Sequence, residues 1–272
     1  MTDMRTPRRL AAEIDGAHRE GRLLSTGDFS ELGDASAARE TARQLDRLRD
    51  PDGTRRAGWK LGYTSEAMRR QMAVDAPNAA PLYRGWAMAS GDGAEDLIHP
   101  RVEPEVIVSF DEDLGAQQVD GDAEEVVRLL GDRVSRAHCA LEVVDSVWRD
   151  YRFTWGENTA DGSSAARFVI GDPLPPASEW NALTVTTSSS DDSPALTGVP
   201  SDVMGHPLLA VAWLLRDLES SGEVLRAGEW VLTGGITASV PLSRGARVYA
   251  RFAGAEWEGF ATVHRGTRTS PQ

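Results

Sequence analysis

The chain has 272 residues, of which 40% are hydrophobic, so it is long enough to bury a full core as one large domain or as a core domain with an appendage. Its 42 acidic residues outnumber its 29 lysines and arginines, and a net charge of −13 argues against nucleic acid as a partner. The single cysteine, Cys139, excludes an internal disulfide and a thiolate metal cluster. No apolar run is long enough for a membrane span, and the charged N-terminal segment does not resemble a signal peptide, so we expect a cytoplasmic protein that binds small molecules.

The N-terminal part of the chain has the pattern of two amphipathic helices. Apolar residues recur at intervals of three and four over residues 7–23 and 35–49, with charged residues between them. The turn sequence DPDG at 50–53 then interrupts the helical pattern. We therefore expect a helical N-terminal region over residues 1–55.

A shorter set of elements follows this turn. The sequence predicts a strand over 57–63 and a helix over 64–72, which is opened by the capping pair Thr64 and Ser65. Two prolines and a glycine then predict a loop over 76–92.

From residue 101 onward the pattern is mostly that of β-strands. A helix is expected over 122–137 and another over 206–222, and the polar run 188–195 is expected to be a hairpin tip or a mobile loop. The expected strands cover residues 101–110, 139–148, 166–172, 182–190, 228–235, 246–254 and 256–264. The sequence therefore predicts an α+β fold, with a helical N-terminal part followed by a mostly antiparallel or mixed β core.

Several common site motifs are absent from the sequence. It contains no glycine-rich nucleotide loop with a lysine, no HExxH and no GxSxG, and the acid-rich segment 110–122 lacks the EF-hand spacing. We expect the five histidines to be structural or exposed because they share no metal-ligand spacing: His18, His99, His138, His206 and His264.

Lys60 is the only lysine in the chain, beside 28 arginines. A GC-rich coding sequence would favour arginine codons, and a lysine that survives this bias points to a need that arginine cannot meet. Such a need is a compact ammonium whose pKa falls with burial, so that it carries a proton on and off near neutral pH. The alternative is a residual surface lysine without a function.

Two glutamates share one face of the strand predicted over 101–110. Glu103 and Glu105 lie two residues apart, and the apolar residues after them indicate that the strand enters the core. Two neighbouring carboxylates there repel each other unless a cation lies between them. Pro104 has no N–H donor and indicates an edge or irregular position, as at the rim of a site.

Glu142 adds a third acid inside an apolar run of the next long strand. Three oxygen donors without a cysteine or histidine partner favour a hard cation, Mg²⁺ or Mn²⁺. The alternative for each glutamate is a solvent-facing position on a half-exposed strand. Spacing alone does not bring Glu142 close to the pair.

At these residues the chain resembles the 2-keto-4-pentenoate hydratase and 4-oxalocrotonate decarboxylase family, within the wider fumarylacetoacetate hydrolase superfamily. The resemblance runs from about residue 55 to 263 and is carried by blocks in the family's order: GWKLGYTSEAMRRQM, PRVEPEVIV, ALEVVDSVW with TADGSSAARFVIGD, GHPLLAVAWL and GEWVLTGGITASVP. It implies a mixed β-sheet roll as the metal-binding catalytic domain over 56–264, followed by a flexible tail over 265–272.

The resemblance also implies roles for individual residues. Glu103, Glu105 and Glu142 fall on the three acidic metal ligands of the family, which implies Mg²⁺ or Mn²⁺ as the cofactor. Lys60 falls on the family's lysine, which supports its role as a proton shuttle.

Further positions of the family concern the substrate. Thr233 and Thr237 are implied as hydroxyl donors near the substrate carboxylate, and Gly234 and Gly235 as positions that permit close backbone approach. Asp161 also matches a family position, with a turn-capping role as the alternative.

The segment after the lysine departs from the family pattern. Asn78 stands where a carboxylate is expected, and an amide neither gives nor takes a proton at neutral pH. Asp75 remains nearby as a carboxylate that could compensate. We expect substrate choice to reside in the loop 76–92 with Tyr83 and Trp86, or else these two aromatic residues only pack a lid.

The resemblance implies a metal-dependent lyase that acts on 2-oxo and 2-hydroxydienoic acids, with the hydratase reaction, water addition to a 2-hydroxypenta-2,4-dienoate-like substrate, placed first. One alternative is a decarboxylase of a 4-oxalocrotonate-like vinylogous keto acid, which needs no water-activating carboxylate. The same apparatus would also serve an isomerase or a carbon–carbon-bond enzyme of a biosynthetic pathway, and a non-catalytic small-molecule-binding module is the hypothesis of a different class. A homo-oligomer is implied by the family alone.

Overall fold

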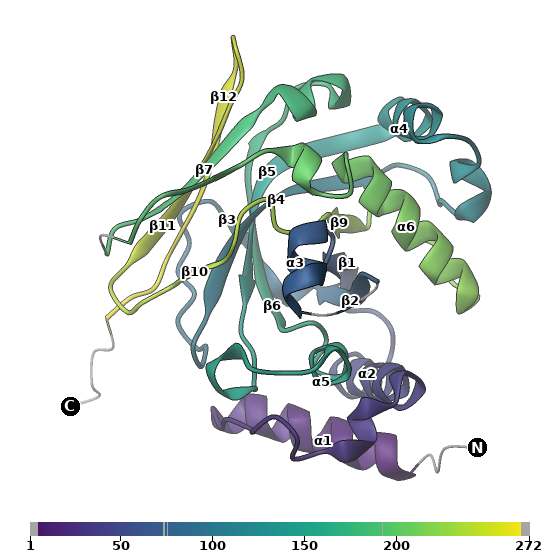
Figure 1. Ribbon diagram of the computed structural model, residues 1–272, viewed down its shortest axis with the longest axis vertical. Helices are drawn as coiled ribbons and strands as arrows, with labels where there is room; N and C mark the ends of the chain where they lie inside the picture. The colour runs from purple at the N-terminus through teal and green to yellow at the C-terminus, as the bar shows by residue number, and fades with distance from the viewer. Residues whose placement is uncertain (1–4, 73, 75, 192, 268–272) are drawn as a thin grey trace.

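The structure is a computed structural model that describes residues 5–72, 74, 76–191 and 193–267. Its N-terminal part consists of two helices, α1 (Arg5–Glu20) and α2 (Ala35–Arg49), which lie together at one end of the molecule (Figure 1). The Asp34 carboxylate caps α2 by accepting a hydrogen bond from the Ala37 N–H. Apolar residues of both helices share a buried cluster with Val147 and Trp148, so the helical part packs on the segment that follows β5.

The large sheet forms the centre of the molecule. Its strand order is β2-β1-β9-β4-β5-β6-β3, with β10 also paired to β4. It is mixed, because β1 with β9 and β3 with β6 are parallel pairs and the other pairs are antiparallel. Its strands are β1 (Arg56–Gly62), β2 (Asn78–Tyr83), β3 (Ala87–Ala89), β4 (Arg101–Phe110), β5 (Val134–Val144), β6 (Ala165–Pro173), β9 (Trp230–Leu232) and β10 (Val240–Pro241).

A second sheet of four strands lies to one side in Figure 1, in the order β12-β11-β7-β8. Burial alternates along β11, as expected of a strand with one face on the core and one face in solvent. The buried residues of β11 join the same apolar core as β5 and α6. The strands are β7 (Thr184–Ser189), β8 (Leu196–Gly198), β11 (Arg247–Ala253) and β12 (Glu258–His264).

Four further α-helices follow in the described part of the chain. The most apolar, α6 (Pro207–Ser220), lies beside α4 (Ala123–Gly131), and both contribute to the main core (Figure 1). The short helices α3 (Glu66–Met72) and α5 (Trp155–Ala160) follow strand β1 and strand β5 in the chain. Among the described residues, no helix combines the length and apolar character that crossing a membrane would require.

The α+β class and the mixed β roll are confirmed by this arrangement, but some elements differ from the prediction. The expected loop 76–92 contains β2 and β3, because β2 is the edge strand of its sheet and an edge strand tolerates Pro81. The helix expected over 122–137 ends at Gly131, because the next residues already pair with β4. Helix α5 and the short strands β8 and β10 were not predicted.

Pro104 lies on an interior strand and not at a sheet edge. On one side of β4, residues 101–102 pair with β10 and residues 107–109 pair with β9, so Pro104 falls in the gap between them. The Pro104 carbonyl accepts a hydrogen bond from the Ile236 N–H, which shows that this edge of the residue faces the loop after β9. The missing N–H of Pro104 therefore removes no hydrogen bond of the β4–β5 ladder.

The tail expected over 265–272 begins later than predicted. Arg265 is buried, and its guanidinium donates hydrogen bonds to the carbonyls of Leu97 and Leu242. The Gly266 N–H donates to the Glu95 carboxylate. Residues 268–272 of the expected tail lie outside the described residues.

Candidate metal centre

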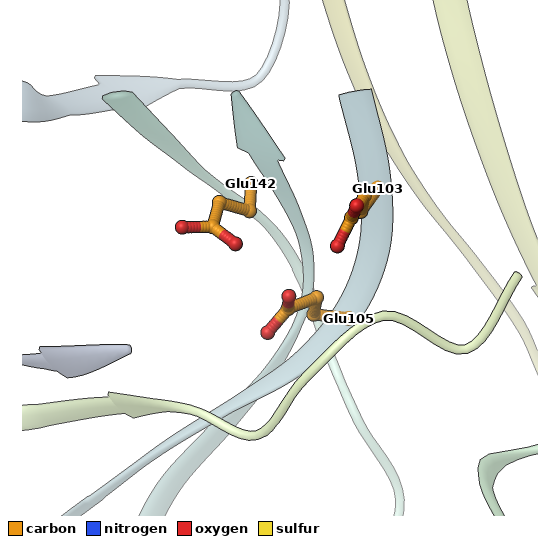
Figure 2. A group of neighbouring side chains, drawn as sticks. All are labelled: Glu103, Glu105 and Glu142. Atoms are coloured by element: carbon orange, nitrogen blue, oxygen red, sulfur yellow. The ribbon is translucent and has the colours of Figure 1, made fainter. Parts of the chain in front are cut away.

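Three glutamate side chains from two neighbouring strands converge on one point. Glu103 of β4 is paired directly with Glu142 of β5, and Glu105 follows Glu103 by two residues on the same face of β4. One carboxylate oxygen of each residue lies within 4.8 Å of the others (Figure 2). Glu105 and Glu142 are completely buried, whereas Glu103 is partly open to a cavity. The structure thus places Glu142 beside the pair Glu103 and Glu105, which spacing in the sequence did not show.

The surroundings of these carboxylates fit a divalent cation. Burial raises the pKa of Glu105 well above its ordinary value, and the Glu142 and Glu103 carboxylates raise it further. Burial also raises the pKa of Glu142 to about 7, although Lys60 opposes this rise. No described residue donates a hydrogen bond to Oε1 of Glu105 or Oε1 of Glu142. Buried like charges without donors are costly, and oxygen ligands of this kind suit Mg²⁺ or Mn²⁺.

Lys60 extends from β1 to the edge of this acidic cluster. Its side chain is only 4% exposed, and Nζ lies 3.1 Å from Oε2 of Glu142. Nζ donates hydrogen bonds to the carbonyl of Ser163 at 2.9 Å and to its hydroxyl at 3.2 Å. Burial lowers the pKa of Lys60, but the three carboxylates outweigh burial and raise it. The expectation of a lowered pKa is therefore wrong for the metal-free site, and so is the alternative of a surface lysine.

A buried network of polar side chains supports Ser163, the residue that accepts hydrogen bonds from Lys60. The Ser163 hydroxyl donates to Oδ1 of Asn78 at 3.0 Å, and Nδ2 of Asn78 donates to the hydroxyl of Thr159 at 3.1 Å and to Oδ1 of Asn158 at 3.4 Å. Ser163 has a φ of 54°, which turns its carbonyl and its hydroxyl toward the same ammonium. Asn78 is thus separated from Lys60 by one hydroxyl group and does not line the cavity.

The loop after β9 contacts the acidic cluster through glycine positions. The Gly234 N–H donates to Oε2 of Glu105 at 2.7 Å, and Gly234 has a φ of 109°. A Cβ atom there would lie 1.8 Å from the Thr64 hydroxyl, and a Cβ at Gly235 would lie 2.8 Å from Oε2 of Glu103. Glycine therefore allows the close backbone approach that was predicted, and the groups approached include two of the acidic side chains.

Three other predicted substrate contacts have different positions. Thr233 is buried, and its hydroxyl donates to the Val106 carbonyl, so it does not reach the cavity and the expected role is not met. Thr237 lines the cavity. The buried Asp161 carboxylate lies 2.6 Å from Nε2 of His18 and accepts from the Val147 N–H, so Asp161 joins α1 to the segment after β5 and lies away from the cavity.

A cavity of about 910 Å³ adjoins this site and is lined by Lys60 and Glu103. Its wall combines apolar or aromatic side chains with arginines, among them Tyr63, Arg69, Arg101, Tyr151, Phe153 and Ile236. None of residues 76–92 lines it in the described part of the chain, so the prediction that this segment selects substrate is wrong. Asp75 lies outside the described residues.

Tyr83 and Trp86 face a different part of the molecule. Their rings meet edge to face with centroids 4.6 Å apart, and the Tyr83 hydroxyl donates to Asp46 of α2. Both line a smaller cavity of about 130 Å³ between the sheet and α2. Tyr83 and Trp86 therefore have a packing role, which was the alternative to a role in substrate choice.

Some residues of the site were missed in the sequence. Ser163 and Asn158 lie in the TADGSSA block or just before it, where nothing in the spacing indicates that a backbone carbonyl would meet Lys60. Arg101 did carry a signal, because it precedes Glu103 by two residues on a predicted strand and must share its face. Tyr151 carried none, since its place depends on a φ of 54° in a turn.

The fold and the site together define a class of protein. A mixed sheet roll, with three carboxylates converging from its two central strands beside a buried lysine, is the framework of a metal-dependent enzyme of the fumarylacetoacetate hydrolase type. No protein-family model matches the chain.

The chain matches hydratases and decarboxylases over most of its length. It is 32% identical over 259 residues to a 2-keto-4-pentenoate hydratase of Burkholderia vietnamiensis strain G4, covering 92% of this chain and 94% of the relative. It is 31% identical over 249 residues to a 4-oxalocrotonate decarboxylase of a Pseudomonas species, covering 88% and 91%. A solved structure of 4-oxalocrotonate decarboxylase from Pseudomonas putida G7, complexed with calcium and acetate, has a TM-score of 0.81 at 26% identity and covers 98% of this chain and 99% of its own. The chain therefore belongs to the family of 2-keto-4-pentenoate hydratases and 4-oxalocrotonate decarboxylases, metal-dependent lyases of the fumarylacetoacetate hydrolase superfamily.

Proposed function

We propose that this protein is a divalent-metal-dependent lyase that adds water to a 2-hydroxypenta-2,4-dienoate-like substrate. The observation that carries the proposal is the convergence of Glu103, Glu105 and Glu142 beside Lys60, at a point where Lys60 and Glu103 line one cavity. Relatives named 2-keto-4-pentenoate hydratase and 2-hydroxyhexa-2,4-dienoate hydratase support the hydratase reaction.

The three glutamates would hold the cation, since Oε1 of Glu105 and Oε1 of Glu142 are buried without a hydrogen-bond donor among the described residues. A divalent cation held there supplies a Lewis acid for the negative charge that develops on a bound 2-oxo acid. The Gly234 N–H donates a hydrogen bond to Oε2 of Glu105, and this bond holds the Glu105 carboxylate in place in the absence of a ligand. Phe153 and Ile236 add apolar surface to the cavity wall, against which the carbon chain of a substrate would pack.

Lys60 carries the protons in this scheme. It begins as an ammonium, because the carboxylates raise its pKa, and it gives a proton to a carbon atom of the substrate. The neutral amine that remains accepts a proton from the water that adds to the alkene. A cation held by the glutamates would weaken their attraction for the ammonium and would so lower the pKa of Lys60. Ser163 keeps Nζ in place throughout.

A second candidate is decarboxylation of a 4-oxalocrotonate-like keto acid. The observation that favours it is the state of Asn78, whose amide donates to Thr159 and accepts from Ser163 and which cannot take a proton from water. Decarboxylation requires no activated water. The relatives named 4-oxalocrotonate decarboxylase are consistent with this reaction.

One assay decides between these candidates. The purified protein is given Mg²⁺ or Mn²⁺ with 2-hydroxypenta-2,4-dienoate or 4-oxalocrotonate, and the ultraviolet absorbance of the conjugated acid, its hydrated product and released CO₂ are followed together. We expect loss of absorbance with a hydrated product, and loss of activity in EDTA that added Mg²⁺ restores. Release of CO₂ without hydration would establish the second candidate, and no metal-dependent turnover of either acid would refute both.

We also propose that the enzyme is a cytoplasmic homo-oligomer with one catalytic domain over 56–264, and that it binds neither nucleic acid nor membranes. The net charge of −13 opposes contact with a phosphate backbone or an anionic lipid surface. The oligomer is supported only by the family resemblance. Light scattering of the purified protein tests it, and a monomer at micromolar concentration would contradict it.

A further inference from the structure

The smaller cavity, of about 130 Å³, lies apart from the candidate metal centre. It is lined by residues of α2, of the C-terminal end of α6 and of strands β1 and β2. Trp59 of β1 lines it, and since successive residues of a strand point to opposite faces, Trp59 and Lys60 lie on opposite faces of β1. Neither Lys60 nor any of the three glutamates lines this cavity, so a ligand held in it would not compete for the metal site.

The buried part of the cavity wall is almost entirely apolar. Apart from Thr159, the buried residues that line it are apolar or aromatic: Leu45, Trp59, Ala80, Tyr83, Ala165 and Leu218. The exposed Arg39 and Arg43 also line it, so the cavity reaches the surface. An apolar cavity of about 150 Å³ holds a benzene molecule, so the volume here suits one six-membered ring.

The charged residues of the lining are balanced and mostly paired. Three arginines and three acids take part: Arg39, Arg43, Arg49, Asp46, Asp217 and Glu223. Each arginine lies 2.9 to 3.6 Å from a carboxylate oxygen, and Glu223 lies 2.9 Å from Arg56. The Asp46 carboxylate accepts a hydrogen bond from the Tyr83 hydroxyl at 2.7 Å. An anion would find no unpaired arginine on this lining, and the equal numbers of acids and arginines favour an uncharged ligand.

Trp59 also carries an unused hydrogen-bond donor. Its indole Nε1–H is buried and has no acceptor among the described residues. Buried donors without an acceptor are uncommon in folded proteins, because the hydrogen bond to water is lost and nothing replaces it. A ligand with an oxygen atom on its ring would bring an acceptor to this tryptophan.

Thr159 links the cavity to Lys60 by a chain of hydrogen bonds. Thr159 lines the cavity, and its hydroxyl accepts from Nδ2 of Asn78 at 3.1 Å. Oδ1 of Asn78 accepts from the Ser163 hydroxyl at 3.0 Å. This hydroxyl in turn accepts from Nζ of Lys60 at 3.2 Å. A ligand that moves Thr159 would therefore change the position of the ammonium.

We propose that this cavity is an effector site for one uncharged aromatic ring with an oxygen substituent, as in phenol. The volume sets the single ring, the paired charges disfavour an ionised group, and the N–H of Trp59 favours the oxygen. The effect of the ligand on turnover rests on the proposed function, in which Lys60 carries protons. Binding of the ligand does not depend on that function.

Binding is tested on the full-length protein in EDTA, so that no metal takes part. The dissociation constants of phenol and toluene are measured by ligand-detected NMR. We expect phenol to bind with a Kd of about 1 mM or below. Toluene, which lacks the oxygen, should bind about fivefold more weakly, as expected for the loss of one hydrogen bond. In Trp59→Phe the two ligands should bind equally.

Two variants that fill the cavity test where the ligand lies. Ala42→Leu adds side-chain volume from α2 and Ser220→Leu adds it from α6, and both residues line the cavity. Each is expected to weaken phenol binding about tenfold or more. Ala35→Leu, at an exposed position of α2 that does not line the cavity, is the matched control. Circular dichroism checks that all three variants fold.

The effector role is tested by kcat with Mg²⁺, measured with and without saturating phenol. We expect a change of about twofold or more in the wild type and in Ala35→Leu, and none in Ala42→Leu. A wild type that does not bind phenol, or folded filling variants that bind it as well as the wild type, would overturn the site. Bound phenol with an unchanged kcat would overturn the effector role. A wild type that turns over neither acid would refute the proposed function, whereas the binding comparison in EDTA would still decide whether the site exists.

Discussion

The ammonium of Lys60 and the carboxylate of Glu142 form a buried ion pair, with Nζ and Oε2 3.1 Å apart and both side chains almost completely excluded from solvent. In such a pair each charge depends on the other, because either one alone would be buried without compensation. Since Glu142 is also one of the three candidate metal ligands, the proton-carrying group and the metal site are coupled through a single carboxylate.

Lys60→Arg is expected to lose nearly all turnover. Arginine keeps the positive charge beside Glu142 but does not release a proton at neutral pH, and its planar head does not fit the two bonds that Nζ makes with Ser163. The measurement is kcat with Mg²⁺, with circular dichroism as the check on folding. Lys60→Met, which keeps the stem of the side chain without a charge, should be equally inactive. Retention of most activity in Lys60→Arg would exclude the proton-shuttle role.

Glu105→Gln is expected to weaken Mg²⁺ binding by at least about tenfold, because the site loses one of its charged oxygens. In EDTA the same variant should be more stable than the wild type, with a melting temperature higher by a few degrees, because one of three mutually repelling buried carboxylates is gone. The amide oxygen can still accept from the Gly234 N–H, so the loop should stay in place. Unchanged Mg²⁺ affinity in calorimetry would count against Glu105 as a ligand.

The stability of the metal-free protein is expected to rise as the pH falls from about 7 toward 5. Burial raises the pKa of Glu142 to about 7 in the folded state, above the ordinary value near 4.5, so the folded protein binds this proton more tightly than the unfolded chain. The gain is about 1 to 3 kcal/mol and is lost as the pH rises through 7. Urea unfolding in EDTA at pH 5.5 and 7.5 measures it. In the control Glu142→Gln the rise should be smaller, and Glu105, whose pKa is also raised, accounts for what remains. Protons and Mg²⁺ compete for the same carboxylate oxygens. The affinity for Mg²⁺ should therefore fall as the pH falls from about 7 toward 5.

Asn78→Asp is expected to raise hydration activity and lower stability. A carboxylate there would accept from the Ser163 hydroxyl that touches Lys60, which adds a proton acceptor to the network. The same carboxylate would turn an oxygen toward Oδ1 of Asn158 where Asn78 now donates, at a cost of about 1 to 3 kcal/mol. Turnover and melting temperature are measured on one preparation. If hydration does not increase while the protein remains folded, this position takes no part in water activation.

The sequence correctly predicted those helices and strands whose apolar periodicity matches the side of the element that is buried in the fold. Helices α1, α2 and α6 and strands β4 and β11 have clear apolar patterns and lie where expected. The prediction errors lie where strand pairing in the sheet outweighs the local sequence pattern. The edge strand β2 contains Pro81, and the first residues of β5 continue a helical pattern while they are hydrogen-bonded to the end of β4.

For the site, the sequence indicated which residue types take part, but it did not show how the strands that carry them are aligned. Alternation on β4 put Glu103 and Glu105 on one face, whereas the pairing of Glu103 with Glu142 depends on a register that no local pattern specifies. Ser163 meets Lys60 only because of a left-handed turn more than a hundred positions away in the chain. Contacts of this kind arise from tertiary packing, which the sequence does not show. For the same reason Thr233 and Asp161, which were expected at the substrate, lie outside the cavity.

Gly235→Ala is expected to weaken metal binding without unfolding the protein. The added Cβ would lie 2.8 Å from Oε2 of Glu103, so this carboxylate must move while the backbone of the loop can remain. We expect the Mg²⁺ dissociation constant to rise by about tenfold, as happens when the partners that orient a metal ligand are disturbed. Gly85→Ala is the matched control, because a Cβ at Gly85 meets nothing within 4 Å. Calorimetry with Mg²⁺ measures both variants. Equal affinities for the two would show that Glu103 does not need its present position to bind the cation.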